Sequence, residues 1–125
     1  MSNEDFDAIS ASTLAVMQRH AEASASGDAK RIAADYAEDA VILISFIDHP
    51  LVGRAAIEEW AANSFQAETE GLRDDAGEAH PEFKTFTSHG EYGYLVVELP
   101  TGAKGTETYH IRNDEILFET ATFFM

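Results

Sequence analysis

The chain has 125 residues, of which 45% are hydrophobic and 25% charged, a size and composition that predict one globular domain over residues 1–125. Its 23 acidic and 8 basic residues give a net charge of −15, which opposes binding to nucleic acid or to an anionic membrane surface. The absence of cysteine excludes disulfides, thiolate nucleophiles and zinc fingers, and no apolar run reaches the roughly 20 residues of a membrane span.

The N-terminal third of the chain has a helical pattern. The first residues are acidic and no apolar signal-peptide core follows them, so we expect a cytoplasmic protein. From Phe6 to Ser26, apolar residues recur every three or four positions, which predicts an amphipathic helix with His20 on its apolar stripe. Gly27 is suited to end this helix, and Asp28 to cap a second, short helix that buries Tyr36.

The middle of the chain changes from a strand pattern to a helical one. Residues 40–46 are dense in β-branched side chains and too few for a good helix, so they predict a buried strand that ends in Phe46. After an Asp-His-Pro break, residues 54–66 predict a third helix with Trp60 on its apolar face. The acidic stretch 68–81 shows neither period and predicts a loop.

The C-terminal third predicts an antiparallel meander of four strands separated by short turns. The strands are residues 83–88, 92–99, 104–112 and 116–124. In the third strand, alternation sends Thr106, Thr108 and His110 to one face. The last strand is apolar on both faces, apart from Glu119 and its threonines. Because one face needs the helices and the other a second partner, we expect a homodimer formed through the sheet.

Three segments carry a resemblance to a known family: Gln18–Asp28, Tyr36–Val41 and Gly53–Ile57. Their order and spacing, with the element order helix, helix, strand, helix and four strands, resemble ketosteroid isomerase and other SnoaL-like proteins of the nuclear-transport-factor-2-like (NTF2-like) superfamily. The resemblance covers nearly the whole chain. It implies a cystatin-like α+β barrel, in which a cone-shaped, curved antiparallel sheet wraps around three N-terminal helices. It also implies a cavity for a small, largely apolar organic molecule, without a cofactor.

The resemblance also bears on individual residues. Ile44 stands where ketosteroid isomerases carry the carboxylate base, His20 where they carry the catalytic tyrosine, and Thr108 at or near the second oxyanion donor. Steroid isomerisation by the family mechanism is therefore not expected. Matching the late strands to the family turns Glu119 inward, where it resembles the acidic residue of SnoaL-like polyketide cyclases. His20 with His110 resembles the histidine pair of scytalone dehydratase.

Together these residues predict an isomerase, lyase or cyclase that acts on an apolar, carbonyl-bearing molecule. His20 and Glu119 would carry protons, because burial brings the pKa values of an imidazole and a carboxyl toward neutrality. Thr108 or His110 would donate a hydrogen bond to the oxyanion. The predicted walls of the cavity are Phe46, Trp60, Tyr94 and Phe123.

Each of these residues also has a purely structural explanation. His20 is equally typical of a hydrogen-bonded core residue, His110 of a strand contact, and Glu119 of a salt bridge at the dimer interface. Asp48 and His49 precede a helix near the expected opening of the cone, where they are candidates for an acid and base at the ligand or for metal ligands, or form an ordinary turn. The five histidines lack the spacing of a metal motif, so no metal site is predicted. The alternative function is a non-catalytic ligand-binding or dimerisation module.

Overall fold

The elements follow the predicted order, with differences at their ends. The computed structural model describes residues 3–71 and 82–124, and only the backbone of residues 64–71. The elements are α1 (Asn3–Ser26), α2 (Ala29–Ala34), β1 (Tyr36–Ile44), β2 (Leu51–Val52), α3 (Arg54–Gly71), β3 (Glu82–His89), β4 (Tyr92–Glu98), β5 (Lys104–Arg112) and β6 (Glu115–Phe124).

The elements β1, β2 and α3 differ from the sequence-based expectation. β1 runs from Tyr36 to Ile44 rather than from residue 40 to residue 46, so Tyr36 belongs to a strand and not to the second helix, and the exposed Phe46 lies beyond the end of the strand. The short strand β2 was not predicted. α3 continues to Gly71, so the start of the predicted acidic loop is helical, and its remainder, residues 72–81, lies outside the described residues.

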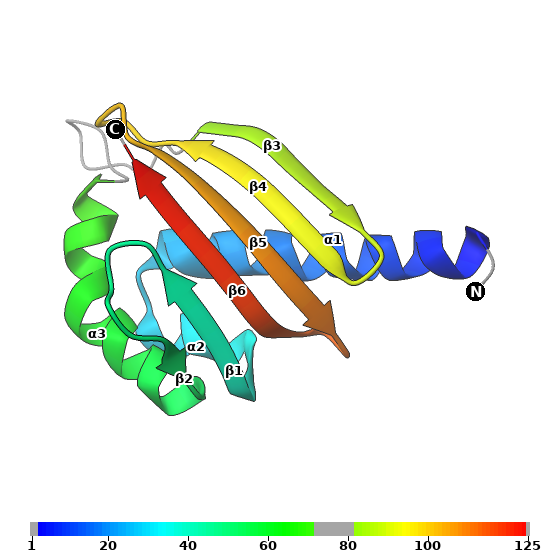
Figure 1. Cartoon of the computed structure of the whole chain (residues 1–125), viewed down its shortest axis with the longest axis horizontal. Helices are drawn as coiled ribbons and strands as arrows, with labels where there is room; N and C mark the ends of the chain where they lie inside the picture. The colour runs from blue at the N-terminus through cyan, green and yellow to red at the C-terminus, as the bar shows by residue number, and fades with distance from the viewer. Residues whose placement is uncertain (1–2, 72–81, 125) are drawn as a thin grey trace.

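The six strands form one curved sheet in the order β2-β1-β6-β5-β4-β3. Neighbouring strands run antiparallel, except that β1 and β6 run parallel, as their arrows show in Figure 1. The antiparallel meander is thus confirmed for β3 to β6, whereas β1 joins that meander in the parallel direction. The two edges, β2 and β3, do not pair with each other, so the cone is open.

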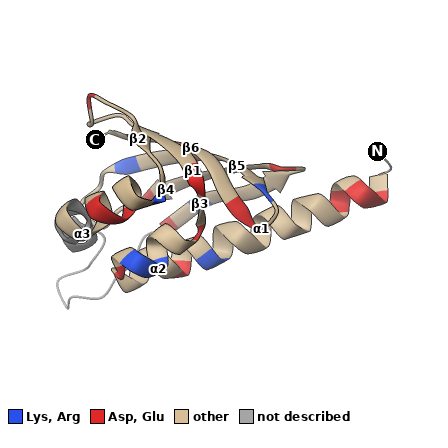
Figure 2. Ribbon diagram, turned by 90° about the horizontal axis from the view of Figure 1, so that it is seen from below, with Lys and Arg blue, Asp and Glu red and all other residues tan. Residues whose placement is uncertain are grey.

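The helices cover one face of the sheet. α1 lies across the inner face, and α2 and α3 close one end of it (Figures 1 and 2). No helix in the described part of the chain lies on the opposite, outer face. Within the same residues, no helix is both long and apolar enough to cross a membrane.

Local chemistry fixes the ends of these elements. The carboxylate of Asp28 accepts hydrogen bonds from the backbone N–H groups of Lys30 and Arg31, as expected of a helix N-cap. Asn113 and Asp114 join β5 to β6 with φ values of 53° and 62°, the left-handed conformation that a two-residue hairpin turn requires.

The buried face of α1 repeats every three or four residues, in agreement with the predicted stripe. It contains Thr13, Val16, Met17, His20 and Ala23. This face lies close to β4, because Gly93 has no side chain there: a Cβ at that position would overlap the sulfur of Met17. The close approach brings His20 against the sheet.

Candidate functional site

A cavity of about 340 Å³ lies between the helices and the inner face of the sheet. This volume is at the lower end of the range for small-molecule sites, about 300–1,000 Å³. Most of its lining is apolar: Met17, Ala21, Ala25, Ile32, Ile42, Ile44, Phe46, Trp60, Phe83, Leu95, Val97, Leu99, Ala103, Ala121 and Phe123. Ala25, Phe46 and Phe83 are exposed, so the cavity reaches the surface beside them.

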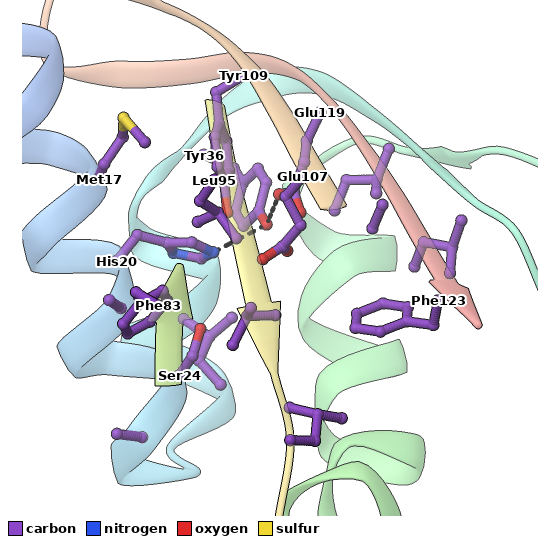
Figure 3. A pocket seen from close by; sticks show the side chains of 18 of the residues that line it. Met17, His20, Ser24, Tyr36, Phe83, Leu95, Glu107, Tyr109, Glu119 and Phe123 are labelled. Atoms are coloured by element: carbon purple, nitrogen blue, oxygen red, sulfur yellow. Dashed lines mark hydrogen bonds between the residues drawn. The ribbon is translucent and has the colours of Figure 1, made fainter. Parts of the chain in front are cut away.

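The polar groups of the lining gather at the buried part of the cavity. They come from different elements: His20 from α1, Tyr36 from β1, Glu107 and Tyr109 from β5, and Glu119 from β6. His20, Tyr36, Tyr109 and Glu119 are each at most 5% exposed. Figure 3 shows these side chains pointing toward one another. Ligand atoms at this end would therefore meet hydrogen-bonding groups, whereas the rest of the lining is hydrocarbon apart from Ser24 and the indole N–H of Trp60.

Hydrogen bonds connect the polar groups into a chain. The carboxylate of Asp35 accepts from Arg19 Nε at 2.6 Å and lies 3.0 Å from His20 Nδ1. On the other side of the imidazole, Nε2 lies 3.1 Å from the hydroxyl oxygen of Tyr36. That hydroxyl is also hydrogen-bonded to Glu119 Oε1 (Figure 3). The chain thus runs from a half-exposed arginine to a buried carboxyl group.

Backbone contacts fix Asp35 and Tyr36, the junction between α2 and β1. The carbonyl of Asp35 accepts from Ile116 N at 2.9 Å, which ties the start of β1 to β6. The carbonyl of Tyr36 accepts from Arg54 Nε at 2.9 Å, and Arg54 also pairs with Glu115. The backbone that carries these two side chains is therefore fixed to β6 through Ile116 and to α3 through Arg54.

Burial and charge set the ionisation of this cluster. Burial raises the pKa of Glu119 well above its ordinary value of 4.5, and the facing carboxyl of Glu107 raises it further. Burial also raises the pKa values of Tyr36 and Tyr109, so both stay neutral hydrogen-bond donors. At Asp35 burial raises the pKa as well, but the hydrogen bonds from His20 and Arg19 outweigh it and lower the pKa. The site thus combines a carboxyl group that holds its proton to a higher pH than an ordinary glutamate with an imidazole that is hydrogen-bonded to the carboxylate of Asp35.

Comparison with known proteins identifies the fold. No protein-family model matches the sequence, and none of the curated proteins does. A SnoaL-like protein of unknown function from Burkholderia thailandensis superposes with a TM-score of 0.72 at 13% identity, over 92% of this chain and 96% of that one. An NTF2-like protein of unknown function from Burkholderia xenovorans gives 0.66 at 18% identity, over 90% and 82%.

A third structure, an uncharacterised protein with a cystatin-like fold from Silicibacter pomeroyi, gives a TM-score of 0.68 at 17% identity, over 88% and 74% of the two chains. The chain has the SnoaL-like, NTF2-like fold. At such identities the similarity establishes the architecture alone, and the chemistry has to be argued from the site.

Five of the predicted site residues line the cavity of this SnoaL-like fold: His20, Phe46, Trp60, Glu119 and Phe123. Glu119, for which the sequence left the cavity and the dimer interface open, faces the cavity. The roles assigned to these residues stay predictions, because their position alone does not demonstrate catalysis or binding.

The prediction was wrong about the orientation of β5. Thr108 and His110 point to the outer face, where Thr108 bonds to Thr120 and His110 Nε2 lies 3.1 Å from Glu91 Oε1. Tyr94 lies opposite Thr108 on β4 and also faces outward. None of the three belongs to the cavity lining.

The physical reason is a β-bulge near the turn between β5 and β6. Ile111 pairs with Ile116, but the next residue, His110, pairs with Phe118, so β6 contains one extra residue at this point. Counting back from the turn without the bulge would place Thr108 opposite Glu119. With the bulge, Tyr109 lies opposite Glu119. Directly paired residues share a face, so Tyr109 faces the cavity and its neighbours do not.

Asp48 and His49 also lie outside the cavity lining. Both side chains are exposed, and His49 Nδ1 lies 2.9 Å from Asp48 Oδ1. They make the ordinary turn that was the alternative explanation. In the described part of the chain, no three His, Cys, Asp or Glu side chains are arranged to hold a metal ion.

Sequence reasoning missed four residues of the polar cluster: Asp35, Tyr36, Glu107 and Tyr109. Glu107 and Tyr109 could have been found from Glu119, since an inward Glu119 requires an inward partner on β5. For Asp35 and Tyr36 the local pattern gave no such signal, because they lie at the junction of two elements and Tyr36 fits a helix face equally well.

Proposed function

We propose that this chain binds a small, apolar, carbonyl-bearing molecule and acts on it as a cofactor-free isomerase, lyase or cyclase. The observation that carries this proposal is the presence of a buried Glu119, whose pKa burial raises, and a hydrogen-bonded His20 in one apolar cavity. Acid–base catalysis needs such a proton donor and acceptor within reach of one ligand, in a site that excludes most water.

In the proposed mechanism, His20 and Glu119 are the proton carriers. Removal of a proton next to a carbonyl group places negative charge on the carbonyl oxygen, which must be stabilised. The buried hydroxyl of Tyr109 takes the place of Thr108 or His110 as the neutral donor to that oxygen. The remaining walls, including Trp60 and Phe123, hold the hydrocarbon part of the ligand.

Proton exchange at carbon tests this proposal without knowledge of the product. Small bicyclic ketones are incubated with the protein in D₂O, and loss of the protons next to the carbonyl is followed by NMR. We expect wild-type protein to accelerate the exchange, and Glu119→Gln or His20→Ala to lower the rate by about 100-fold. His110→Ala is the matched control and keeps the wild-type rate, because His110 lies on the outer face.

Binding is measured in parallel through Trp60, the single tryptophan of the chain and part of the cavity lining. If ketones change the Trp60 fluorescence but the exchange rate equals that of buffer, the non-catalytic ligand-binding module is the correct function. If they neither bind nor exchange, the proposed ligand class is wrong.

We also propose that two copies of the chain associate through the outer face of the sheet. Large apolar side chains are exposed there: Leu43 at 44%, Tyr94 at 40%, Phe118 at 37% and Phe124 at 50%. Exposed large apolar side chains on one face of a sheet, here interspersed with Thr108, Thr120 and Thr122, are typical of an interface. Sedimentation velocity tests the proposal: Phe118→Glu is expected to give a monomer, whereas Phe6→Glu, at a similarly exposed phenylalanine on α1, keeps the dimer. A wild-type monomer would contradict it.

A further inference from the structure

The hydroxyl group of Tyr36 lies between two groups that bind protons. Its oxygen is 3.1 Å from His20 Nε2 and is also hydrogen-bonded to Glu119 Oε1. A phenol has only one proton to donate. If Tyr36 donates to one neighbour, the other neighbour has to supply the proton of the second hydrogen bond. Either Glu119 or His20 is therefore protonated at the atom facing Tyr36.

Asp35 decides which nitrogen of His20 takes part. Its Oδ2 lies 3.0 Å from His20 Nδ1, and its Oδ1 accepts from Arg19 Nε at 2.6 Å. Because a carboxylate can only accept hydrogen bonds, Nδ1 has to carry a proton. Nε2 is then the atom that gains and loses a proton, on the side of Tyr36. Arg19 is itself anchored by a hydrogen bond to the carbonyl of Asp114 at 2.8 Å.

We propose that these residues form a proton relay, in which Tyr36 carries a proton between Glu119 and His20 while Asp35 positions the imidazole. In the transfer, the O–H bond of Glu119 breaks as an O–H bond forms on Tyr36, and the original O–H bond of Tyr36 breaks as an N–H bond forms on His20 Nε2. Glu119 becomes a carboxylate and His20 an imidazolium, while Tyr36 is a neutral phenol before and after.

The groups around the relay act on it in opposite directions. Asp35 faces the imidazolium and stabilises it, an effect that Arg19 partly offsets. On β5, Glu107 faces Glu119 and opposes formation of its carboxylate, and the ring of Tyr109 packs edge-on to His20 with centroids 6.1 Å apart. On α3, the described residue of the lining is Trp60, which does not titrate. Asp35 thus favours the proton on His20, whereas Glu107 favours it on Glu119, and the two effects oppose each other.

The relay deepens the proposed function and rests on it, because it joins the two proposed proton carriers into one unit. Because both nitrogens of His20 are engaged, by Asp35 and by Tyr36, a proton that the ligand gives to Glu119 passes to His20 through Tyr36 and returns the same way without passing through water. Of the three proposed reaction classes, this suits an isomerisation, in which a proton leaves one atom of the substrate and enters another.

NMR of the ligand-free protein, labelled with ¹⁵N-histidine and ¹³C-carboxyl glutamate, tests the transfer step. In the pH range where the pair holds one proton, we expect His20 Nε2 and the Glu119 carboxyl both to show shifts between their protonated and deprotonated limits. Tyr36→Phe keeps the ring but cannot carry a proton. In this variant the chemical shifts of His20 Nε2 and of the Glu119 carboxyl should each lie at the value of a fully protonated or a fully deprotonated group. Tyr109→Phe, the matched control, removes the other buried hydroxyl of the cavity and leaves the intermediate shifts unchanged.

Three results would overturn the transfer through Tyr36. The first is a wild-type protein whose His20 and Glu119 shifts lie at their limits throughout the titration. The second is a Tyr36→Phe variant that keeps the intermediate shifts. The third is a Tyr109→Phe variant that loses them to the same extent. Backbone amide spectra establish beforehand that each variant is folded.

A second pair of variants tests the positioning role of Asp35. Asp35→Asn removes the charge beside His20, so the ratio of imidazolium to neutral imidazole at a given pH is expected to fall about tenfold or more. Asp48→Asn is the matched control, since Asp48 pairs with the exposed His49 in the same way, and it leaves His20 unchanged. An unchanged ratio and tautomer of His20 in Asp35→Asn would exclude this role.

Arg19→Gln provides a milder variant should Asp35→Asn not fold. Arg19 is half-exposed, and its loss leaves Asp35 without the opposing positive charge, so the imidazolium fraction of His20 is expected to rise. A fall or no change would contradict the relay. None of these measurements needs a ligand. The relay can therefore fail while ketones still bind in the cavity, and deuterium exchange can fail while the relay holds.

Discussion

The buried carboxyl group of Glu119 faces the half-buried carboxyl group of Glu107 in a cavity whose described lining holds no lysine or arginine. Burial removes the water that would stabilise a carboxylate at Glu119, and a negative charge on Glu107 would repel it, so the pKa of Glu119 is raised. The same arrangement that makes Glu119 a proton donor therefore costs stability whenever that proton is lost.

This cost predicts that the difference in the free energy of unfolding between wild type and Glu119→Gln depends on pH. Because the pKa of Glu119 is higher in the folded chain than in the unfolded one, the folded chain binds more protons between these two values. The free energy of unfolding contributed by Glu119 is thus fully present below about pH 4.5 and is lost as pH rises toward the folded pKa. Each unit of pKa difference corresponds to about 1.4 kcal/mol.

Thermal unfolding of both proteins from pH 4 to pH 9 measures this difference. Glu119→Gln cannot ionise, so we expect its Tm to rise relative to wild type as pH increases. Glu38→Gln, at an exposed position of β1, controls for the loss of one acidic residue and should show little such trend. A constant gap between wild type and Glu119→Gln would mean that Glu119 ionises as easily in the folded chain as in the unfolded one.

Among the elements, α1 and β4 make the contact that positions His20. Gly93→Ala would force a methyl group against the sulfur of Met17, which is 2% exposed and has little room to move. We expect a loss of about 1–3 kcal/mol in the free energy of unfolding, measured by chemical denaturation. In a Met17→Ala background the same substitution should cost clearly less, because the overlapping atoms are gone. Equal costs in both backgrounds would exclude the steric explanation.

The elements themselves were largely predictable from local patterns. The stripe of α1, the cap at Asp28 and the four late strands follow from spacing and turn chemistry, which act within a few residues. The boundary at Tyr36 was not predictable in the same way, because a buried tyrosine fits the end of a short helix as well as the start of a strand. It is pairing with β6, over 70 residues away in sequence, that makes Tyr36 part of the sheet.

At the scale of the whole molecule, net charge and the apolar outer face act against each other. Two chains of charge −15 repel, and in the view of Figure 2 lysine and arginine do not gather in one patch that would offset this. Salt screens repulsion between exposed charges and leaves apolar contacts intact. The dissociation constant of the proposed dimer should therefore fall as NaCl rises from about 20 to 500 mM. Over this range the Debye length shortens, and it is below about 10 Å once the salt exceeds about 100 mM.

Sedimentation equilibrium over this salt range measures the dimer dissociation constant. A dissociation constant that rises with salt would indicate an interface held by ion pairs rather than by Phe118 and its apolar neighbours. The Phe118→Glu variant should remain monomeric at every salt concentration, because salt does not remove the cost of burying its carboxylate.

The sequence by itself determined the helices, the strands other than β2 and the short turns of the meander, and its resemblance to a family implied the apolar cavity with His20 and Glu119. It also determined, through alternation, that Thr108 and His110 share a face and that Tyr109 lies on the other. Alternation has a period of two and is symmetric, so it does not say which face meets the helices. One extra residue in β6 decides that, and the packing of α1 against the junction of α2 and β1 decides that Asp35 and Tyr36 meet His20. Both depend on contacts between distant segments, which exist only once the chain has folded.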